Sequence, residues 1–241
     1  MLVVRLGIGE MNRLGLVKLY DIDERYYPVP SNAVLPEWYK KTHPYLNDKK
    51  HPHGMTIKRC IPVFDAITSG YTILLHADIF VSFEYQDNQK TQVTQWSNLI
   101  NFPFIQSHVF EQFSNYPEAE KGVAAKKFIN PFAVFTPAGY SCLFTQPMHQ
   151  DKSPIKMFEG VVDTDKEHIV NFPFVYVDPD FEGVIPAGTP IAQIIPFKRE
   201  SWKLEIDNKK DLESYEKHKR KLGANIFAQY RDFFWTRKEY K

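Results

Sequence analysis

Apolar residues in the middle of the chain fall into short runs that are rich in β-branched and aromatic side chains and are separated by turn residues. Such runs predict short strands, and they occur in residues 58–86, 91–105, 129–147 and 159–200. In TPAG, residues 136–139, proline and glycine suit the central positions of a turn. Many short strands with regular turns predict a mainly β fold, built as a distorted barrel or sandwich.

The two ends of the chain follow different patterns. Residues 26–54 contain five prolines, a density that excludes a regular helix and predicts an extended arm with one helical turn near LPEWYKK. Residues 208–241 are charged in their first half and aromatic in their second half, which predicts a helix that packs against the body or a neighbouring subunit. The expected parts are an N-terminal arm, residues 1–56, a core, residues 57–200, and a helical tail, residues 201–241.

The charge of the chain is nearly balanced, with 30 basic and 29 acidic residues and a formal net charge of +1. No field of one sign therefore draws nucleic acid or an anionic membrane to the whole surface. No apolar run reaches the roughly 18 to 20 residues that span a bilayer, and no secretory signal is evident. Cys60 and Cys142 lie in separate apolar stretches and are expected to be free thiols, so a soluble cytoplasmic protein is expected.

Two aspartates, Asp163 and Asp165, lie between apolar runs in GVVDTD. Aspartates in such positions are ordinary turn residues, because their carboxylates accept hydrogen bonds from nearby backbone N–H groups. The alternative is that they belong to a site. Lys198 and Arg199 directly follow the last predicted strand, where they would either clamp a phosphate or form exposed salt bridges.

Histidines suggest two metal sites. His76 and Asp78, followed by His149 or His168, have the order of a facial triad for non-haem iron, and a hydrogen-bonded His76 is the alternative interpretation. HPH at residues 51–53 has two potential zinc ligands, but the surrounding arm supplies no others. Neither pattern is specific, and the sequence assigns no metal ligand.

Three segments, in order along the chain, resemble the dUTPase and dCTP deaminase superfamily. IPVFDAITSGYTILLHADIFV, residues 61–81, is similar to the first family motif, in which a proline-led strand runs into a turn and a second strand. FAVFTPAGYSCLFTQP, residues 132–147, resembles the following strand pair. GVVDTD and IPAGTPIAQIIPF resemble the last two motifs. The resemblance implies a β-clip fold, a homotrimer with ligand pockets between subunits, a nucleotide-like ligand and Mg²⁺.

The resemblance also assigns roles to residues. Asp163 matches the carboxylate that orients or deprotonates the attacking water beside the sugar, which makes it the expected catalytic residue. Gln193 matches the amide of the closing motif. The ligand-binding set expected from these motifs and from the basic pair consists of Asp165, Gln193, Tyr71, Thr72, Lys198 and Arg199.

The chain departs from the family pattern at several positions. Thr72 replaces an aspartate, and Lys166 replaces the aromatic platform for the base. The Pro-Arg-Ser-Gly phosphate motif and the glycine-rich C-terminal lid are both absent from the sequence. We therefore expect a protein that binds a nucleotide or a related phosphorylated small molecule, with turnover left open.

Three alternatives remain: a Mg²⁺-dependent nucleotide pyrophosphohydrolase, a non-catalytic structural or assembly protein of phage type, and a non-haem iron oxygenase. The whole chain also resembles a protein family of tailed phages. That second resemblance implies no particular function, but it would place the protein in the cytoplasm of a host cell.

Overall fold

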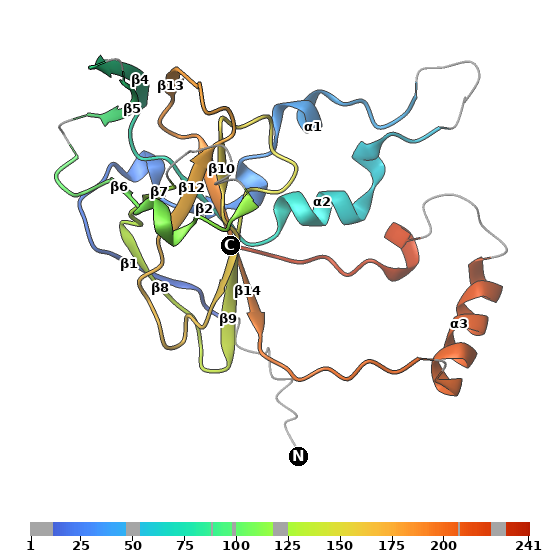
Figure 1. Cartoon of the computed structure of the whole chain (residues 1–241). Coiled ribbons are helices and arrows are strands. Elements are labelled where there is room, and N and C mark those ends of the chain that lie inside the picture. The colour runs from blue at the N-terminus through green and yellow to red at the C-terminus, as the bar shows by residue number, and fades with distance from the viewer. Residues whose placement is uncertain are drawn as a thin grey trace.

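The computed structural model describes residues 12–46, 54–87, 89–97, 100–117, 125–206, 208–222 and 230–241. Within these residues the fold is mainly β, with short antiparallel strands in four sheets that do not close into one barrel (Figure 1). The mainly β prediction is therefore confirmed.

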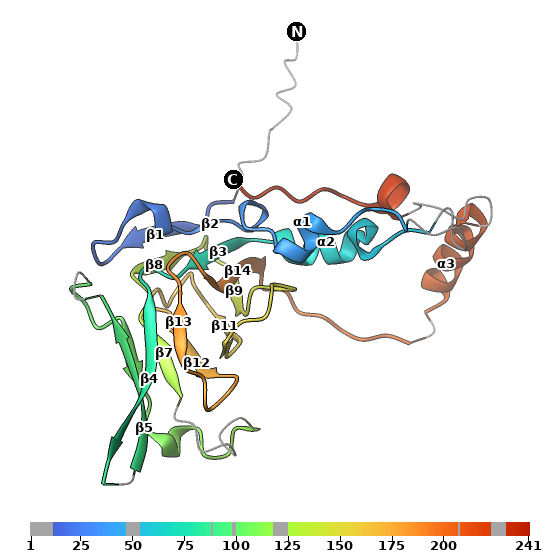
Figure 2. The same ribbon diagram turned by 90° about the horizontal axis from the view of Figure 1, so that it is seen from above.

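The largest sheet has five strands, in the order β11 (Gly160–Val162), β9 (Tyr140–Thr145), β14 (Pro190–Lys198), β3 (Tyr71–Leu74) and β2 (Val29–Pro30). The four-stranded sheet has the order β10 (Ile155–Met157), β12 (Phe172–Tyr176), β7 (Lys126–Phe128) and β6 (Ile105–Ser107). Three strands form the next sheet, β13 (Gly183–Ile185), β4 (Ile79–Gln86) and β5 (Gln89–Trp96). Finally, β1 (Gly15–Lys18) pairs with β8 (Phe132–Phe135). Figure 2 shows the β4–β5 hairpin reaching away from the side that carries the short helices.

One hydrophobic cluster joins these sheets. In β14 the central residues 191–194 are all buried, because this strand is covered by β9 and β3 at its edges and by core side chains. The four-stranded sheet contributes stacked rings: Phe128 and Phe174 have centroids 4.1 Å apart, and Tyr176 meets Phe174 edge-on at 5.7 Å. Such aromatic pairs add to the stabilisation that comes from buried area.

Residues 61–68 form a helix, α2 (Ile61–Thr68), and the strand predicted for this segment is wrong. Proline in the first turn lacks an N–H that the helix would leave unpaired there anyway, so Pro62 is compatible with a helix start. Ile61, Phe64 and Ile67 are spaced three residues apart and place apolar side chains on one helix face. The single helical turn expected in the proline-rich arm is present as α1 (Glu37–Lys41).

The tail contains the predicted helix, α3 (Lys209–Leu222), which lies apart from the sheets in both ribbon views. A π-helical turn, Tyr230–Phe234, follows, and the last residues return to the body. There the Trp235 Nε1–H donates to both carboxylate oxygens of Asp65 at 3.0 Å, and the Lys238 ammonium donates to Asp65 at 2.6 Å. Asp65 is a residue of α2, so the end of the chain is anchored to this helix.

Both cysteines are free, Cys142 in the core and Cys60 at the start of α2, as expected. None of the helices in the described part of the chain is long and apolar enough to cross a membrane.

His76 is a buried polar residue just after β3. Its ring lies beside Phe104 and Phe132, with centroids 6.1 and 6.5 Å away. It shares a hydrogen bond with the backbone of Tyr26, while its Nδ1 has no hydrogen-bond partner among the described residues. Burial lowers the pKa of His76 to about 4, because the charged imidazolium would lose its hydration.

This histidine is expected to make the protein less stable in mild acid. The folded state keeps His76 neutral, whereas the unfolded chain binds a proton below its ordinary pKa of about 6.5, so stability is lost as the pH falls from about 6.5 toward 4. Between pH 8 and pH 5 we expect His76 to lower the free energy of unfolding by about 2 kcal/mol. Urea unfolding at several pH values measures this loss. His76→Gln should lack it, and equal pH slopes for the two proteins would contradict the assignment.

Candidate functional site

The two aspartates of the GVVDTD segment lie in a tight turn that directly follows β11. The backbone N–H groups of Lys166 and Glu167 both donate to the Asp163 carbonyl, at 2.8 and 2.9 Å. Because Val162 is opposite Cys142 in β9, the turn is placed beside the β8–β9 connection. The turn predicted from the sequence is therefore present. The side chains of Asp163 and Asp165, however, contact residues that are distant in sequence.

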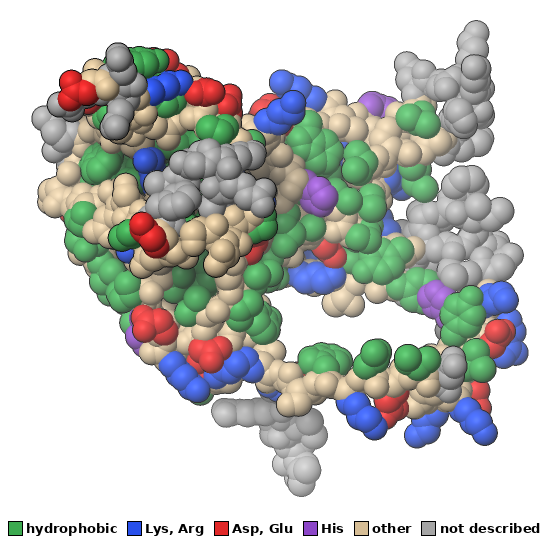
Figure 3. Space-filling model, viewed as in Figure 1, with side chains coloured by type: hydrophobic (Ala, Val, Ile, Leu, Met, Phe, Trp, Pro, Cys, Tyr) green, Lys and Arg blue, Asp and Glu red, His purple; other side chains and the backbone are tan. Residues whose placement is uncertain are grey.

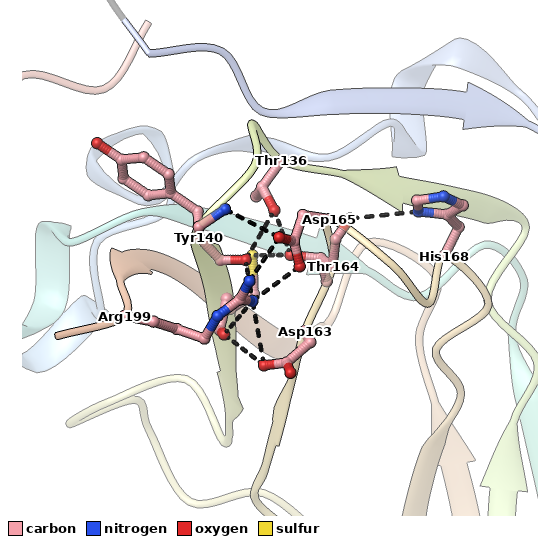
Figure 4. A network of polar contacts seen from close by, with 10 residues as sticks. Thr136, Tyr140, Asp163, Thr164, Asp165, His168 and Arg199 are labelled. Carbon is pink, nitrogen blue, oxygen red and sulfur yellow. Dashed lines mark hydrogen bonds and ion pairs between the residues drawn. The ribbon is translucent and has the colours of Figure 1, made fainter. Parts of the chain in front are cut away.

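Asp165 forms a two-pronged pair with Arg199, at the end of β14 (Figure 4). The two guanidinium nitrogens donate to the two carboxylate oxygens at 2.7 and 2.5 Å, and the Gly139 N–H adds a third hydrogen bond at 2.9 Å. The Arg199 guanidinium, and after it the Gly139 N–H, hold the pKa of Asp165 well below its usual range, and the pKa of Arg199 is raised in return. Only 8% of the Asp165 side chain is exposed, and both of its carboxylate oxygens accept hydrogen bonds from Arg199.

Asp163 is in a different environment from Asp165. Its Oδ1 accepts a hydrogen bond from the Ser141 hydroxyl at 2.7 Å and lies 3.2 Å from Arg199 Nη1. The other carboxylate oxygen has no partner among the described residues, and 49% of the side chain is exposed. Of the two aspartates, Asp163 is thus the one with a carboxylate oxygen available to a ligand.

Thr164 fixes the turn between the two aspartates. It is fully buried, with its hydroxyl 2.8 Å from the Thr136 hydroxyl and within 3.3 Å of Cys142 Sγ. The His168 ring completes the network shown in Figure 4, with Nδ1 at 3.2 Å from the carbonyls of Val134 and Thr164. These contacts give the turn a defined position on the sheet before any ligand binds.

The iron site suggested by the sequence is not assembled. Asp78 accepts a hydrogen bond from the Ala187 N–H at 2.7 Å, His76 is buried among aromatic rings, and His168 belongs to the network around Thr164. In the part of the chain that the structure describes, no three His, Cys, Asp or Glu side chains are grouped to hold a metal ion. The histidines of HPH at residues 51–53 lie outside the described residues.

Gln193 is buried and uses its whole amide in hydrogen bonds within the chain. Its nitrogen donates to the carbonyls of Ala66 and Ser69 at 3.0 and 2.6 Å, and its oxygen accepts from the Met148 N–H at 2.9 Å. Gln193 is opposite Thr145 in β9, four residues from the Ser141 that contacts Asp163, which is about 13 Å along a strand. Asp163 and Gln193 therefore do not meet within one chain.

The other expected ligand residues have internal or surface partners. Thr72 is buried and donates to the Ser31 hydroxyl at 2.9 Å, while Lys198 is exposed and pairs with Glu200 at 3.3 Å. The Tyr71 hydroxyl donates to the Lys241 carbonyl at 3.1 Å, and its ring meets the edge of Tyr240. Burial, and after it the neighbouring Tyr240, raises the pKa of Tyr71.

Tyr71 opens onto a cavity of about 250 Å³ that the sequence did not reveal. Its walls combine apolar, hydroxyl and charged groups from five separate parts of the chain: Asn12, Arg13, Leu14, Tyr71, Thr136, Pro137, Tyr140, Pro196, Glu239 and Tyr240. Asn12 fixes the Tyr140 hydroxyl with a hydrogen bond of 2.7 Å, and the Tyr140 carbonyl accepts from Arg199 at 2.8 Å. Tyr140 therefore connects the cavity to the Asp165–Arg199 pair.

Sequence reasoning missed Arg13, Tyr140 and Tyr240 as possible site residues. Tyr140 directly follows the predicted TPAG turn, which was a usable signal because connections between rigid strands often carry binding residues. Arg13 and Tyr240 lie at opposite ends of the chain, and nothing in their local sequence indicates that they meet.

No protein-family model and no curated protein matches this chain. Among solved structures, a mutant dUTPase from phage phi11 of S. aureus is 12% identical, with 83% of this chain and 99% of that chain covered and a TM-score of 0.33. A Staphylococcus bacteriophage 80alpha dUTPase mutant with dUpNHpp is also 12% identical, with 82% and 90% covered and a TM-score of 0.32. These values assign neither a ligand nor an activity to the chain.

Proposed function

We propose that the protein binds a nucleotide or a related phosphorylated small molecule in the cavity lined by Tyr71, Tyr140 and Tyr240. The observation that carries the proposal is the convergence of three tyrosines and Arg13 on one cavity. Aromatic side chains stack on bases of any kind, and a guanidinium binds a phosphate through two parallel hydrogen bonds. The motifs that resemble the dUTPase and dCTP deaminase superfamily flank the same cavity, since Tyr71, Tyr140 and Pro196 all belong to them.

In this proposal the Asp165–Arg199 pair positions the site and does not contact the ligand. Arg199 Nη1 donates both to Asp165 and to the Tyr140 carbonyl, at 2.7 and 2.8 Å, so the pair holds the backbone from which the Tyr140 ring projects. These hydrogen bonds are already made within the chain and do not have to form when a ligand binds. The cavity would thus be largely preformed.

Turnover would depend on Asp163. Its available oxygen suits a carboxylate that orients or deprotonates a water molecule. Asp163 is not among the residues that line the tyrosine cavity of its own protomer. We therefore propose that any hydrolysis uses the trimer implied by the sequence motifs, with Asp163 of one protomer facing the cavity of its neighbour.

Magnesium fits this site to a limited degree. Mg²⁺ is usually held by one or two carboxylates together with substrate phosphates and water. Asp163 supplies one available oxygen, whereas both oxygens of Asp165 are bound by Arg199 and Gly139. The ion would therefore be held by Asp163 and would supply charge neutralisation for phosphates, without a metal site made by the protein alone.

Thermal unfolding with a nucleotide panel, with and without Mg²⁺, tests the proposal. A ligand at one hundred times its Kd adds about 2.7 kcal/mol to the free energy of unfolding. For a chain of this length that stabilisation raises the Tm by roughly 5 to 10 °C. Tyr140→Leu should abolish most of the rise, because it removes one ring of the cavity. Arg13→Ala should weaken binding of nucleotides more than that of the matching nucleosides.

The matched control is Tyr85→Leu, which removes an exposed tyrosine on β4, far from the cavity. It should leave the rise in Tm unchanged. A panel in which no compound raises the Tm, or a rise that survives Tyr140→Leu, would refute binding at this cavity. Release of pyrophosphate that requires Mg²⁺ and is lost in Asp163→Asn would support turnover, whereas binding without release would identify a non-catalytic nucleotide-binding protein.

A further inference from the structure

Residues 201–206, which link β14 to α3, form an extended segment with one apolar and one polar side. Trp202, Leu204 and Ile206 are 88, 86 and 80% exposed. They alternate with Lys203 and Glu205, whose side chains form an ion pair of 3.0 Å and therefore lie on the same side. Side chains that alternate in this way are typical of a β-strand with one face in contact with another surface.

The backbone of this segment is unpaired as well. The Arg199 N–H, bonded to the Gly139 carbonyl at 2.8 Å, is the last backbone donor of the preceding sheet. Between residues 200 and 206 no backbone–backbone hydrogen bond is present among the described residues. The space-filling view shows hydrophobic side chains along one border of the segment, charged ones along the other, and an opening between the segment and the body (Figure 3). An extended segment with free backbone groups and apolar side chains is a template for pairing with another strand.

We propose that this segment pairs, antiparallel, with the same segment of a second copy of the chain, around a twofold axis at Leu204. This twofold contact uses a different surface from the threefold contact proposed for Asp163. In that register Leu204 meets its own counterpart, Trp202 is opposite Ile206, and Lys203 is opposite Glu205 of the partner subunit. All apolar residues then lie on one face of the two-stranded ribbon, and both charge pairs on the other are complementary. A parallel pairing would place Lys203 against Lys203, so the charges favour the antiparallel arrangement.

The exposed apolar surface near the segment is comparable in area to one side of a stable interface. In α3, Leu212 and Tyr215 are spaced three residues apart on one face and are 60 and 57% exposed. Together with Trp202, Leu204 and Ile206 they expose roughly 700 Å² of side-chain surface per chain, since a large aromatic side chain alone carries about 150–250 Å². Stable interfaces bury about 800 Å² per partner. If the pairing of two chains buries this surface, including the apolar face of α3, the interface is of ordinary size.

Reversing the charge of Lys203 or Glu205 distinguishes pairing between chains from the ion pair within one chain. Lys203→Glu places two glutamates opposite one another at both positions, and Glu205→Lys does the same with lysines. Each variant alone should therefore associate at least tenfold more weakly than the unchanged protein in sedimentation velocity. A mixture of the two variants restores both charge pairs in the mixed dimer, although neither chain has regained its internal ion pair. We expect the mixture to regain the association that each variant lacks.

A cysteine at the twofold axis gives a second, independent measurement. Leu204→Cys should form a disulfide-linked dimer on mild oxidation, because residue 204 faces its own counterpart, while Trp202→Cys should do so far more slowly. The unchanged protein measures the background from Cys60 and Cys142. A monomeric unchanged protein at about 100 μM, a mixture that stays as dissociated as its components, or equal cross-linking of the two cysteine variants would each overturn the proposal. Pairing of the segment with its own body or with a different protein would give these same negative results.

Discussion

Replacing Gly70 by alanine is expected to lower the free energy of unfolding by about 3 kcal/mol or more. Gly70 has a φ of +68° and crosses β14 where β3 begins, and a Cβ there would lie 1.9 Å from the Ile194 carbonyl oxygen and 2.8 Å from its carbon. Both are backbone atoms of the central strand, so no side-chain rotation can relieve the overlap. Urea unfolding, followed by tryptophan fluorescence, measures the loss.

Two other glycines separate the steric effect from the conformational one. Gly139 has a φ of +85° but no atom within 4 Å of an added Cβ, so Gly139→Ala should cost about 1–2 kcal/mol from the left-handed backbone alone. Gly160 has an ordinary φ and equally open surroundings, and Gly160→Ala should change stability little. If Gly70→Ala and Gly139→Ala proved equally stable, the close approach of residue 70 to β14 would be incorrect.

Gln193→Glu should destabilise the fold by a similar amount, about 3 kcal/mol or more at neutral pH. The substitution replaces a donor by a carboxylate oxygen that faces the carbonyls of Ala66 and Ser69, in a buried position. Burial would raise the pKa of the new glutamate, and its protonated form can donate one of the lost hydrogen bonds. The deficit relative to the unchanged protein should therefore shrink as the pH falls through that raised pKa.

Gln106→Glu is the matched control, because Gln106 is exposed on β6 and the substitution makes the same change of charge. It should have little effect on the urea midpoint. A Gln193→Glu protein as stable as this control would mean that the amide does not hold the end of α2 against β14. The residue would then be available for the ligand-binding role that the sequence motif suggested.

The strands could be predicted where the local pattern and the turn residues agree. TPAG separates two apolar runs, and β8 and β9 appear on either side of it. In α2 the local pattern was ambiguous, since IPVFDAIT contains β-branched residues at both helical and strand spacing. The burial of Ile67 and the contact of Asp65 with the tail favour the helix, and both depend on residues that are distant in sequence.

The candidate site was predicted only in part, because its contacts also join residues that are distant in sequence. The acidic turn and the basic end of β14 were identified, but the pairing of Asp165 with Arg199 requires the order of β11, β9 and β14 in the sheet. Gln193 was recognised from its motif, although its hydrogen bonds serve the packing of α2. The tyrosine cavity collects residues from both ends of the chain, and no local pattern encodes such a meeting.

The anchoring of the final residues to α2 couples their attachment to the binding of a ligand in the tyrosine cavity. Asp65 receives hydrogen bonds from Trp235 and Lys238, and Tyr240, two residues further on, forms a wall of the tyrosine cavity. A small molecule held against Tyr240 would make detachment of the final residues less favourable. By thermodynamic linkage, detachment of the final residues would lower the affinity for that molecule by the same factor. One carboxylate on a short helix would in this way influence how tightly a ligand is held.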